Sequence, residues 1–386
     1  MKQTIQTIMI VAGEASGDTH GAHLIKAMLS RNKNTQFIGV GGDQMKKAGA
    51  KIYVHLKDLS VVGITEVFSK RGGIIAGLNT AKDLLREKRP DLLILIDYPD
   101  FNLNLARTAK NLDISVLYYI SPQIWAWRSG RVKKIKHRVD HVAVILPFEA
   151  DFYRKYKVPV TYVGHPLLEH PAISLPDIKK DPKIKTIGLL PGSRDGEINN
   201  LLPIMAKTAN ILAGTYDDIQ FLIPRAPTIQ KEQIQGILDQ CQGNNNPKFL
   251  IVDYEARQVF HQSDLVIVAS GTATLEAALA ETPMIIIYRV SYISYYLVKI
   301  LIHCPHIGLA NLVAGQRVVP ELMQDDASPE KIHQTACQLL DNPDRMEKIR
   351  RKLKMVRQRL GGPGASQKTA NIAFQLIKQK KLSNMK

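Results

Sequence analysis

An apolar run that ends on a carboxylate is the first feature of the sequence that could do chemistry. The run LLILID stops at Asp97, and the turn YPDFN follows. A carboxylate at the carboxyl end of a buried parallel strand lies at the rim of the sheet, where partial desolvation tunes it for general-base work. Asp100 is the competing carboxylate, but Pro99 and Asn102 mark a turn, so Asp100 more plausibly begins the next helix. We therefore predict that Asp97 is catalytic.

A second pair of carboxylates follows the first apolar run. The stretch VAGEASGDTHGAHL, residues 11–24, carries Glu14 and Asp18 among small residues. It lacks the G-x-G-x-x-G spacing of dinucleotide sites, and Glu14 would repel a phosphate. We expect a glycine turn that lets a bulky ligand approach, and we expect Asp18 to be the N-cap of the following helix.

The stretch LLPGSRDGEI, residues 189–198, has the pattern of an anion site. A tight turn between a strand and a helix offers backbone N–H groups and the positive end of the helix dipole. Ser193 lies in this turn, and Arg194 adds a guanidinium fork for phosphate oxygens. An ordinary turn with a surface arginine fits the same residues equally well.

A second helix start of this kind lies at SGTATLE, residues 270–276. Gly271 and Thr272 open the helix, and their N–H groups suit a diphosphate. Glu276 follows within the first turns, where a carboxylate can accept hydrogen bonds from ribose hydroxyls. The two helix starts together predict a site for one nucleoside diphosphate.

Three polar residues stand out in the loop-like run of residues 306–326. They are Asn311, Glu321 and Gln324, whose amide and carboxylate groups suit hydrogen bonding to a sugar or phosphate. The histidines do not fall in metal-ligand spacing, and no metal site is expected.

Three further segments combine basic residues with aromatic or apolar ones. Residues 121–138 hold both tryptophans and six Lys and Arg, a pattern that fits nucleic-acid stacking, a sugar or acyl pocket, or a solvated basic helix. Residues 64–78 and 291–304 are apolar with few cations, so either is a candidate for contact with a bilayer interface or for a buried helix.

The elements that must position these residues alternate between strand-length apolar runs and helix-length amphipathic segments. This alternation predicts parallel α/β organisation, with ligands bound outside the carboxyl ends of the strands. A proline-rich stretch predicts a linker at 167–184 between domains at 1–166 and 185–360, and a last helix, at 361–386, can cross back to the first domain. The cleft between two such sheets is the default site. We expect strands at 7–13, 36–42, 91–97, 115–121, 141–147 and 160–166, and again at 185–191, 219–224, 248–253, 264–270 and 283–288.

Composition narrows the class of protein. At 386 residues the chain exceeds one hydrophobic core, and its net charge of +17 favours a polyanionic partner: nucleic acid, an anionic bilayer or a phosphorylated substrate. Three widely spaced cysteines suggest a reducing compartment. The first residues read as a strand rather than a signal peptide, and no apolar run is long enough to span a bilayer, so we expect a cytoplasmic protein.

Seven motifs, taken together and in order, resemble the lipid-A-disaccharide synthase family. The resemblance runs from the N-terminus to about Gln324. The motifs are AGEASGD (12–18), IDYPDFN (96–102), SPQIWAWR (121–128), GHPL (164–167), LLPGSRDGEI (189–198), SGTATLE (270–276) and PELMQ (320–324).

The resemblance implies a GT-B glycosyltransferase with two Rossmann-like domains facing across a cleft, peripheral on the cytoplasmic face of the inner membrane. It implies transfer from UDP-2,3-diacylglucosamine to 2,3-diacylglucosamine 1-phosphate (lipid X), giving the β-1,6-linked lipid A disaccharide 1-phosphate and UDP. No cofactor, catalytic metal or nucleic-acid partner is expected.

Residue roles carry over by the motifs. The family's functional Asp, Arg and Asn fall on Asp97, Arg194 and Asn311. Asn311 lies in LANLVA rather than in the commoner LPN, and this departure concerns the geometry of the loop that holds it. Asp97 would be the base, Glu14 would orient the acceptor or compete for that role, and Glu276 would bind ribose. The alternatives are another GT-B enzyme, either a UDP-N-acetylglucosamine 2-epimerase or a peptidoglycan N-acetylglucosaminyltransferase, and a basic nucleic-acid-binding protein.

Overall fold

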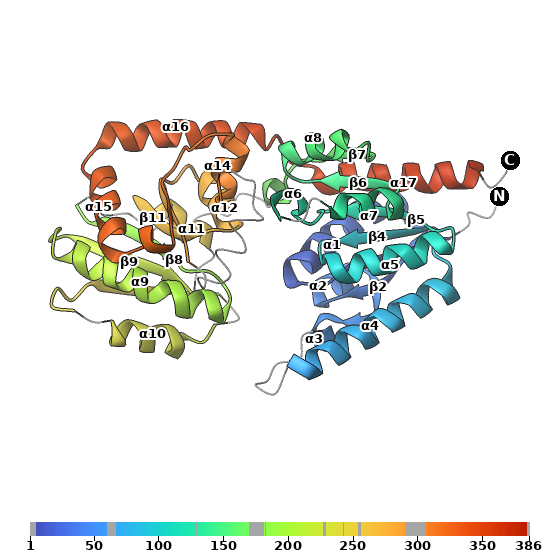
Figure 1. The fold of residues 1–386 in the computed structure, drawn as a ribbon, viewed down its shortest axis with the longest axis horizontal. Helices are drawn as coiled ribbons and strands as arrows, with labels where there is room; N and C mark the ends of the chain where they lie inside the picture. Colours follow the sequence, from blue (N-terminus) through green and yellow to red (C-terminus); the bar gives the residue numbers. More distant parts are fainter. Residues whose placement is uncertain are drawn as a thin grey trace. The chain divides into compact units, whose positions relative to one another are not determined.

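The computed structural model describes residues 5–59, 67–127, 130–169, 181, 183–226, 229–241, 243–253, 256–289 and 306–383. Its contacts divide the chain into two units, one of Met1–Pro171 with Gly362–Lys386 and one of Ala172–Gly361 (Figure 1). The segment 291–304, most of the predicted linker and residues 64–66 lie outside the described residues.

The first unit is built on a seven-stranded sheet in the order β3-β2-β1-β4-β5-β6-β7, with every neighbouring pair parallel. Its strands are β1 (Gln6–Ala12), β2 (Thr35–Gly41), β3 (Ala50–His55), β4 (Leu92–Ile96), β5 (Ser115–Tyr119), β6 (His141–Val144) and β7 (Val160–Tyr162). Its helices are α1 (Ala15–Leu29), α2 (Asp43–Lys47), α3 (Leu56–Leu59), α4 (Val67–Lys88), α5 (Pro99–Asn111), α6 (Ile124–Trp127), α7 (Arg131–Arg138), α8 (Pro147–Lys155), the 3-10 helix η1 (Pro166–Glu169) and α17 (Ala365–Ser383).

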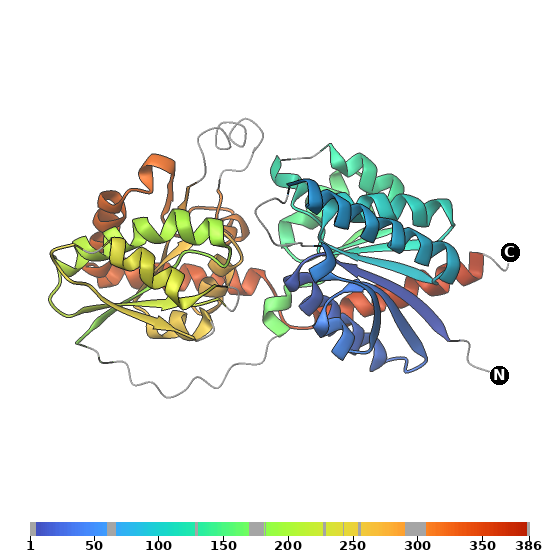
Figure 2. The same ribbon diagram turned by 90° about the horizontal axis from the view of Figure 1, so that it is seen from below.

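Helices cover both faces of this sheet, as the alternation of side chains along a strand requires. Met9 and Val11 of β1 belong to a core with residues of α4, α5, α7 and α8. Ile8 and Ile10, on the opposite face of the same strand, pack in a second core with residues of α1, α2 and α17 (Figure 2). Continuous apolar strands therefore reflect a sheet buried on both sides.

The last helix, α17, is part of the first unit although it is distant in sequence. Ala370, Ala373 and Ile377 are buried in the core on the α1 side of the sheet. At the start of the helix, the Ser366 backbone N–H and hydroxyl both donate to the Glu169 carboxylate, at 2.6 Å each. Packing and this polar clamp together hold α17 on the first sheet.

The second unit contains a six-stranded parallel sheet in the order β10-β9-β8-β11-β12-β13. Its strands are β8 (Lys185–Leu190), β9 (Ile219–Pro224), β10 (Lys248–Val252), β11 (Leu265–Ala269), β12 (Met284–Tyr288) and β13 (Glu321–Met323). Its helices are α9 (Asp195–Ala213), α10 (Lys231–Gln240), α11 (Ala256–Gln262), α12 (Ala273–Leu279), α14 (Leu309–Ala314), the 3-10 helix η2 (Gln324–Asp326), α15 (Pro329–Leu340) and α16 (Pro343–Arg359).

Both units are thus parallel α/β sheets, and the predicted class of two Rossmann-like domains is confirmed. The strands β3 and β13 were not predicted. β3 lies at an edge of its sheet with several partly exposed residues, and β13 has three residues, so neither forms the long apolar run that marks a central strand. The run 306–326, read as a loop, contains α14 and β13.

Candidate functional site

The order of the strands reverses between β1 and β4 in the first sheet and between β8 and β11 in the second. In doubly wound sheets, ligands bind beyond the carboxyl ends of the strands at such a switch point. Glu14 and Asp97 follow β1 and β4, while Arg194 and Gly271 follow β8 and β11. The main candidates from the sequence therefore lie at the two switch points.

Asp97 follows the fully buried strand β4 in an unusual backbone conformation. Asp97 and Tyr98 have φ angles of 46° and 47°, in the left-handed region that non-glycine residues rarely adopt. Each such residue costs about 1–3 kcal/mol and persists only where its surroundings hold it. Strain of this kind gathers at functional sites.

Neighbouring polar groups hold the Asp97 backbone in this conformation. The Tyr118 hydroxyl donates to the Asp97 carbonyl oxygen at 2.7 Å, and Asn102 Nδ2 donates to the same oxygen at 2.6 Å. The Asp97 N–H donates to the carbonyl oxygen of Ile120 at 3.1 Å. The first turn of α5 and the end of β5 thereby hold the backbone from which the Asp97 side chain projects.

Asp97 lines a cavity of about 280 Å³ at the ends of β4, β5 and β6. The other polar side chains that line this cavity are those of Ser121, Gln123, Arg131 and Glu149. Arg131 also pairs with the exposed carboxylate of Asp100, at 2.5 Å. The carboxylate of Asp100 is therefore engaged on the next helix, as expected, while Asp97 faces the cavity.

Glu149 was missed by the reasoning from sequence. It is 1% exposed, and burial raises its pKa to about 7, although donors to the carboxylate oppose this shift. Those donors include the Leu146 N–H at 3.0 Å and the Trp125 indole N–H at 3.1 Å. The available signal was the sequence LPFE after a strand, which is typical of a helix start with proline first and glutamate third.

Glu14 lies beside the Asp97 turn. It is the exposed N-cap residue of α1, and Ala12, at the end of β1, is the register partner of Ile96. Burial raises the pKa of Tyr98, and the negative charge of Glu14 raises it further, so Glu14 acts on the residue next to Asp97. A Cβ on Gly13 would lie 2.2 Å from the Tyr98 ring, which explains the glycine.

The prediction that Asp18 caps its own helix is wrong. Asp18 lies inside α1 and is 4% exposed. Its carboxylate accepts hydrogen bonds from the N–H groups of Gly42, Gln44 and Met45, at 2.7, 2.9 and 3.1 Å. It therefore caps α2, a helix that is distant in sequence and has no side-chain cap of its own.

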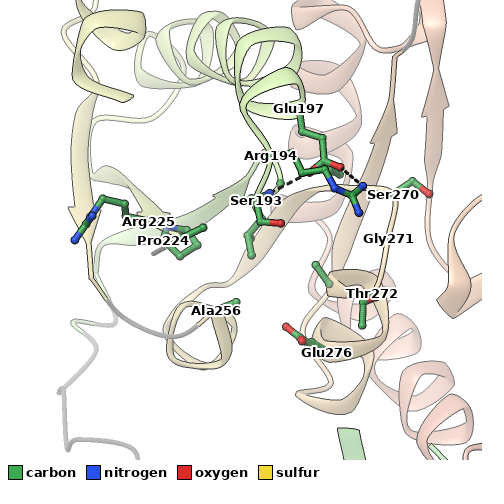
Figure 3. Close-up of a pocket in the computed structure, with 15 residues that line it drawn as sticks. Ser193, Arg194, Glu197, Pro224, Arg225, Ala256, Ser270, Gly271, Thr272 and Glu276 are labelled. Carbon is green, nitrogen blue, oxygen red and sulfur yellow. Dashed lines mark hydrogen bonds and ion pairs between the residues drawn. The ribbon is translucent and has the colours of Figure 1, made fainter. Parts of the chain in front are cut away.

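In the second unit, five residues predicted to bind substrate line one pocket of about 450 Å³. Figure 3 shows Ser193 and Arg194, before α9, on one side of it and Gly271, Thr272 and Glu276, at the start of α12, on the other. These five residues come from two turns that are distant in sequence. The structure thus brings both predicted helix starts to a single hollow.

Charges in this pocket are mixed. The Arg194 side chain is 72% exposed and pairs loosely with Glu197, at 3.3 Å, while Arg225 also lines the pocket. The Ser193 N–H donates to Glu197 at 3.0 Å, so this N–H is not an open donor as the sequence suggested. A Cβ on Gly271 would meet open space, which leaves room for a ligand against that turn.

Asn311, Glu321 and Gln324 are not among the residues that line this pocket. Asn311 is fully buried and uses its whole hydrogen-bonding capacity internally. Its Nδ2 donates to the Val319 carbonyl and to Glu321, and its Oδ1 accepts from the N–H groups of Val318 and Val319.

Glu321 also accepts hydrogen bonds from the N–H groups of Ile307 and Gly308, at 3.1 and 3.0 Å. Gln324 is 6% exposed, with a φ angle of 50°. Asn311 and Glu321 thus organise the chain before β13, while Gln324 begins the 3-10 helix η2 after it. In this structure Asn311 has no hydrogen-bonding group left for a substrate.

The described residues contain neither a metal-binding cluster nor a membrane-spanning helix. No group of three or more His, Cys, Asp or Glu side chains among them is arranged to hold a metal ion. Of the helices in the described ranges, none is both long enough and apolar enough to cross a bilayer.

Comparison with known proteins gives close relatives over nearly the whole chain. The family model described as lipid-A-disaccharide synthetase matches residues 8–376. The lipid-A-disaccharide synthase of Syntrophus aciditrophicus is 45% identical, over 96% of this chain and 98% of its own. That of Geobacter metallireducens is 44% identical, over 97% of this chain and 98% of its own.

Solved structures similar to this one share its fold at low sequence identity. Acinetobacter baumannii MurG has a TM-score of 0.60 and 14% identity, covering 96% of this chain and 99% of its own. The calicheamicin glycosyltransferase CalG4 has a TM-score of 0.62 and 16% identity, covering 97% of this chain and 99% of its own. The S. aureus MnaA–UDP complex has a TM-score of 0.63 and 14% identity, covering 94% of each chain. The fold is therefore that of GT-B glycosyltransferases.

Proposed function

This chain belongs to the lipid-A-disaccharide synthase family and is a UDP-sugar glycosyltransferase, and on that premise we propose its substrates and the roles of its residues. The donor is UDP-2,3-diacylglucosamine, and the acceptor is lipid X. The products are the β-1,6-linked lipid A disaccharide 1-phosphate and UDP.

The observation that carries this assignment is the pocket of the second unit. The pocket has a volume of about 450 Å³, in the size range of small-molecule sites. It is bordered by the starts of α9 and α12 and by the side chains of Arg194 and Glu276. The N–H groups before α12 and the guanidinium of Arg194 suit a diphosphate, and Glu276 suits ribose hydroxyls. The MnaA structure of the same fold holds UDP, as its description states.

The reaction inverts the configuration at the anomeric carbon, from an α-linked donor to a β-linked product. The acceptor 6-hydroxyl oxygen bonds to that carbon as the bond to the diphosphate breaks, and UDP leaves with the electron pair. Asp97 takes the hydroxyl proton, a role supported by its strained and firmly held backbone. Arg194 stabilises the charge that develops on the leaving diphosphate.

The remaining predicted site residues take supporting roles. Glu14 orients the acceptor sugar near Asp97 or competes for its proton. Ser193, Gly271 and Thr272 border the diphosphate. Asn311 and Glu321 act by holding the segment before β13 through the hydrogen bonds described above, and Gln324 begins the 3-10 helix that follows β13.

We also propose that the enzyme works at the cytoplasmic face of the inner membrane as a peripheral protein. The net charge of +17 favours an anionic surface, and acylated substrates reside there. Ile75, on the predicted membrane segment 64–78, is 57% exposed in α4. An exposed apolar side chain within a basic protein suits an interfacial contact.

Incubation with UDP-2,3-diacylglucosamine and lipid X, with product identified by mass spectrometry, tests this function. We expect the disaccharide 1-phosphate and UDP in equal amounts, and Arg194→Ala should weaken both turnover and UDP binding. Turnover of UDP-N-acetylglucosamine with no need for acyl chains would instead assign another GT-B activity. Affinity for polynucleotides that rises with their length would support the nucleic-acid alternative.

A further inference from the structure

The first unit holds a second carboxyl group in the cavity of Asp97. Glu149, in the first turn of α8, and Asp97, beyond β4, line the same space of about 280 Å³. Both belong to one unit: Asp97 follows β4 and Glu149 lies in the helix that follows β6, with β5 between these two strands in the sheet. The proposed reaction assigns proton transfer to Asp97 and gives no role to Glu149.

Among the residues that the structure describes, the groups bonded to Glu149 are neutral donors. The Leu146 N–H and the Trp125 indole N–H donate to its two oxygens, and the Trp125 ring packs edge-on against Phe148, with ring centroids 4.8 Å apart. Arg131 lines the cavity, but its short ion pair is with Asp100. Within the described part of the chain, no cation lies within ion-pair distance of Glu149.

Charged and titratable groups face Glu149 from several elements. Burial raises the pKa of Glu149 to about 7, and the charge of Asp97 contributes in the same direction. The charge of Glu149 in turn contributes to raising the pKa values of Tyr153, in α8, and Tyr162, in β7, where burial is the main cause. Glu149 and Asp97 thus influence each other as like charges that line one small cavity.

We propose that Glu149 is a positioning residue that sets the proton affinity of Asp97. When Glu149 is ionised, repulsion between the two carboxylates favours the protonated form of Asp97. As the acceptor oxygen bonds to the anomeric carbon, its proton passes to Asp97, and the ionised Glu149 makes that uptake more favourable. The coupling of the two carboxyl groups is independent of the proposed function, while its effect on the rate rests on that function.

The coupling can be measured without any substrate. Trp125 and Trp127 are the two tryptophans of the chain, so a protein labelled with ¹⁵N-tryptophan gives two indole signals, and Trp127→Phe assigns them. Because the Trp125 indole donates to Glu149, its signal should shift with a midpoint near pH 7. Asp97→Asn should move this midpoint lower by roughly one pH unit, since a neighbouring negative charge is lost.

Asp151→Asn is the matched control, because Asp151 is an exposed carboxylate on the same helix and pairs with Arg154. It should leave the midpoint where it is in the unchanged protein. A midpoint that Asp97→Asn does not move, or one that Asp151→Asn moves equally, overturns the coupling. This outcome would leave the glycosyltransferase assignment intact.

The effect on the rate is tested by the pH profile of kcat for the synthase reaction. In the unchanged enzyme, kcat should rise about threefold as Glu149 ionises, the Brønsted response to roughly one pK unit of coupling. Glu149→Gln should lose that rise, with the KM for the acceptor unchanged. A rise that persists in Glu149→Gln overturns the role in the rate, and Trp125→Phe, which keeps the carboxyl, should retain the rise with a shifted midpoint.

Discussion

The backbone conformation of Asp97 depends on individual hydrogen bonds from neighbouring side chains rather than on regular helix or strand geometry. Its carbonyl oxygen receives the Tyr118 hydroxyl and the Asn102 amide, which hold a left-handed backbone at the end of a buried strand. The backbone from which the side chain enters the cavity is therefore held in one conformation. Preorganised direction is what a general base requires.

At this residue scale, Asp97→Asn should lower kcat by about 10²–10⁴-fold, the usual contribution of a general base. UDP affinity, measured by calorimetry, should stay the same because Asp97 is not among the residues that line the nucleotide pocket. Asp100→Asn is the control, since its exposed carboxylate lies in the first turn of α5 and pairs with Arg131. Equal losses of kcat in both variants would remove the special role of Asp97.

Glu149 also gives a prediction about stability. Its pKa is raised from an ordinary 4.5 to about 7 by burial, so the folded protein keeps this proton in a pH range where the unfolded chain releases it. The free energy of unfolding should therefore fall between these two pH values, relative to Glu149→Gln, by on the order of 3 kcal/mol.

Urea unfolding of the two proteins at a series of pH values measures this difference. Asp151→Asn should show no comparable change, because its carboxylate is 80% exposed. A difference between the unchanged protein and Glu149→Gln that does not vary with pH would mean that Glu149 titrates normally in the folded state.

At the scale of elements, the turn after β1 depends on the absence of a side chain at Gly13. An added Cβ would lie 2.2 Å from the ring of Tyr98. Because Tyr98 directly follows Asp97, a shift of this ring would move the backbone beside Asp97. Gly13→Ala should destabilise the fold by roughly 1–3 kcal/mol, as overpacking does, and should lower kcat. Gly72→Ala in α4 is the matched control, since its Cβ would meet open space.

Thermal unfolding and steady-state rates of these two alanine variants test the turn. We expect Gly72→Ala to be neutral or slightly stabilising, because glycine within a helix costs about 0.5–1 kcal/mol relative to alanine. If Gly13→Ala unfolds and turns over like Gly72→Ala, the ring of Tyr98 moves aside freely and does not position Asp97.

The sequence predicted the central strands and five residues of the pocket in the second unit because both leave local signals. Long apolar runs mark the buried parallel strands, and small residues before Arg194 and Thr272 mark strand-to-helix turns. Long-range contacts leave no such signal. Asp18 caps the neighbouring helix α2, the amide of Asn311 is fully hydrogen-bonded within a buried network, and Glu149 is buried by elements that are distant in sequence.

The whole molecule carries a net charge of +17, which belongs to no single site. Such a charge attracts an anionic bilayer and phosphorylated substrates over about one Debye length. Salt weakens this attraction. The domain limits of 1–166 and 185–360 remain predictions from the sequence, beside the two contact units of the structure.

At this scale we expect binding to vesicles that contain phosphatidylglycerol, with weaker binding as salt rises and little binding to neutral vesicles. Ile75→Ser should reduce co-sedimentation with these vesicles while leaving thermal unfolding unchanged, because the side chain is 57% exposed. Exposed Leu382→Ser, on the last helix, is the control. Unchanged partition of Ile75→Ser would move the predicted membrane contact to residues 291–304.

A crystal structure of the protein with bound UDP tests the central claim most directly. The diphosphate should lie within hydrogen-bond distance of Arg194 and of the backbone N–H groups after Ser270, with the ribose at Glu276. A nucleotide bound away from the pocket formed by the turns after β8 and β11 would contradict the account.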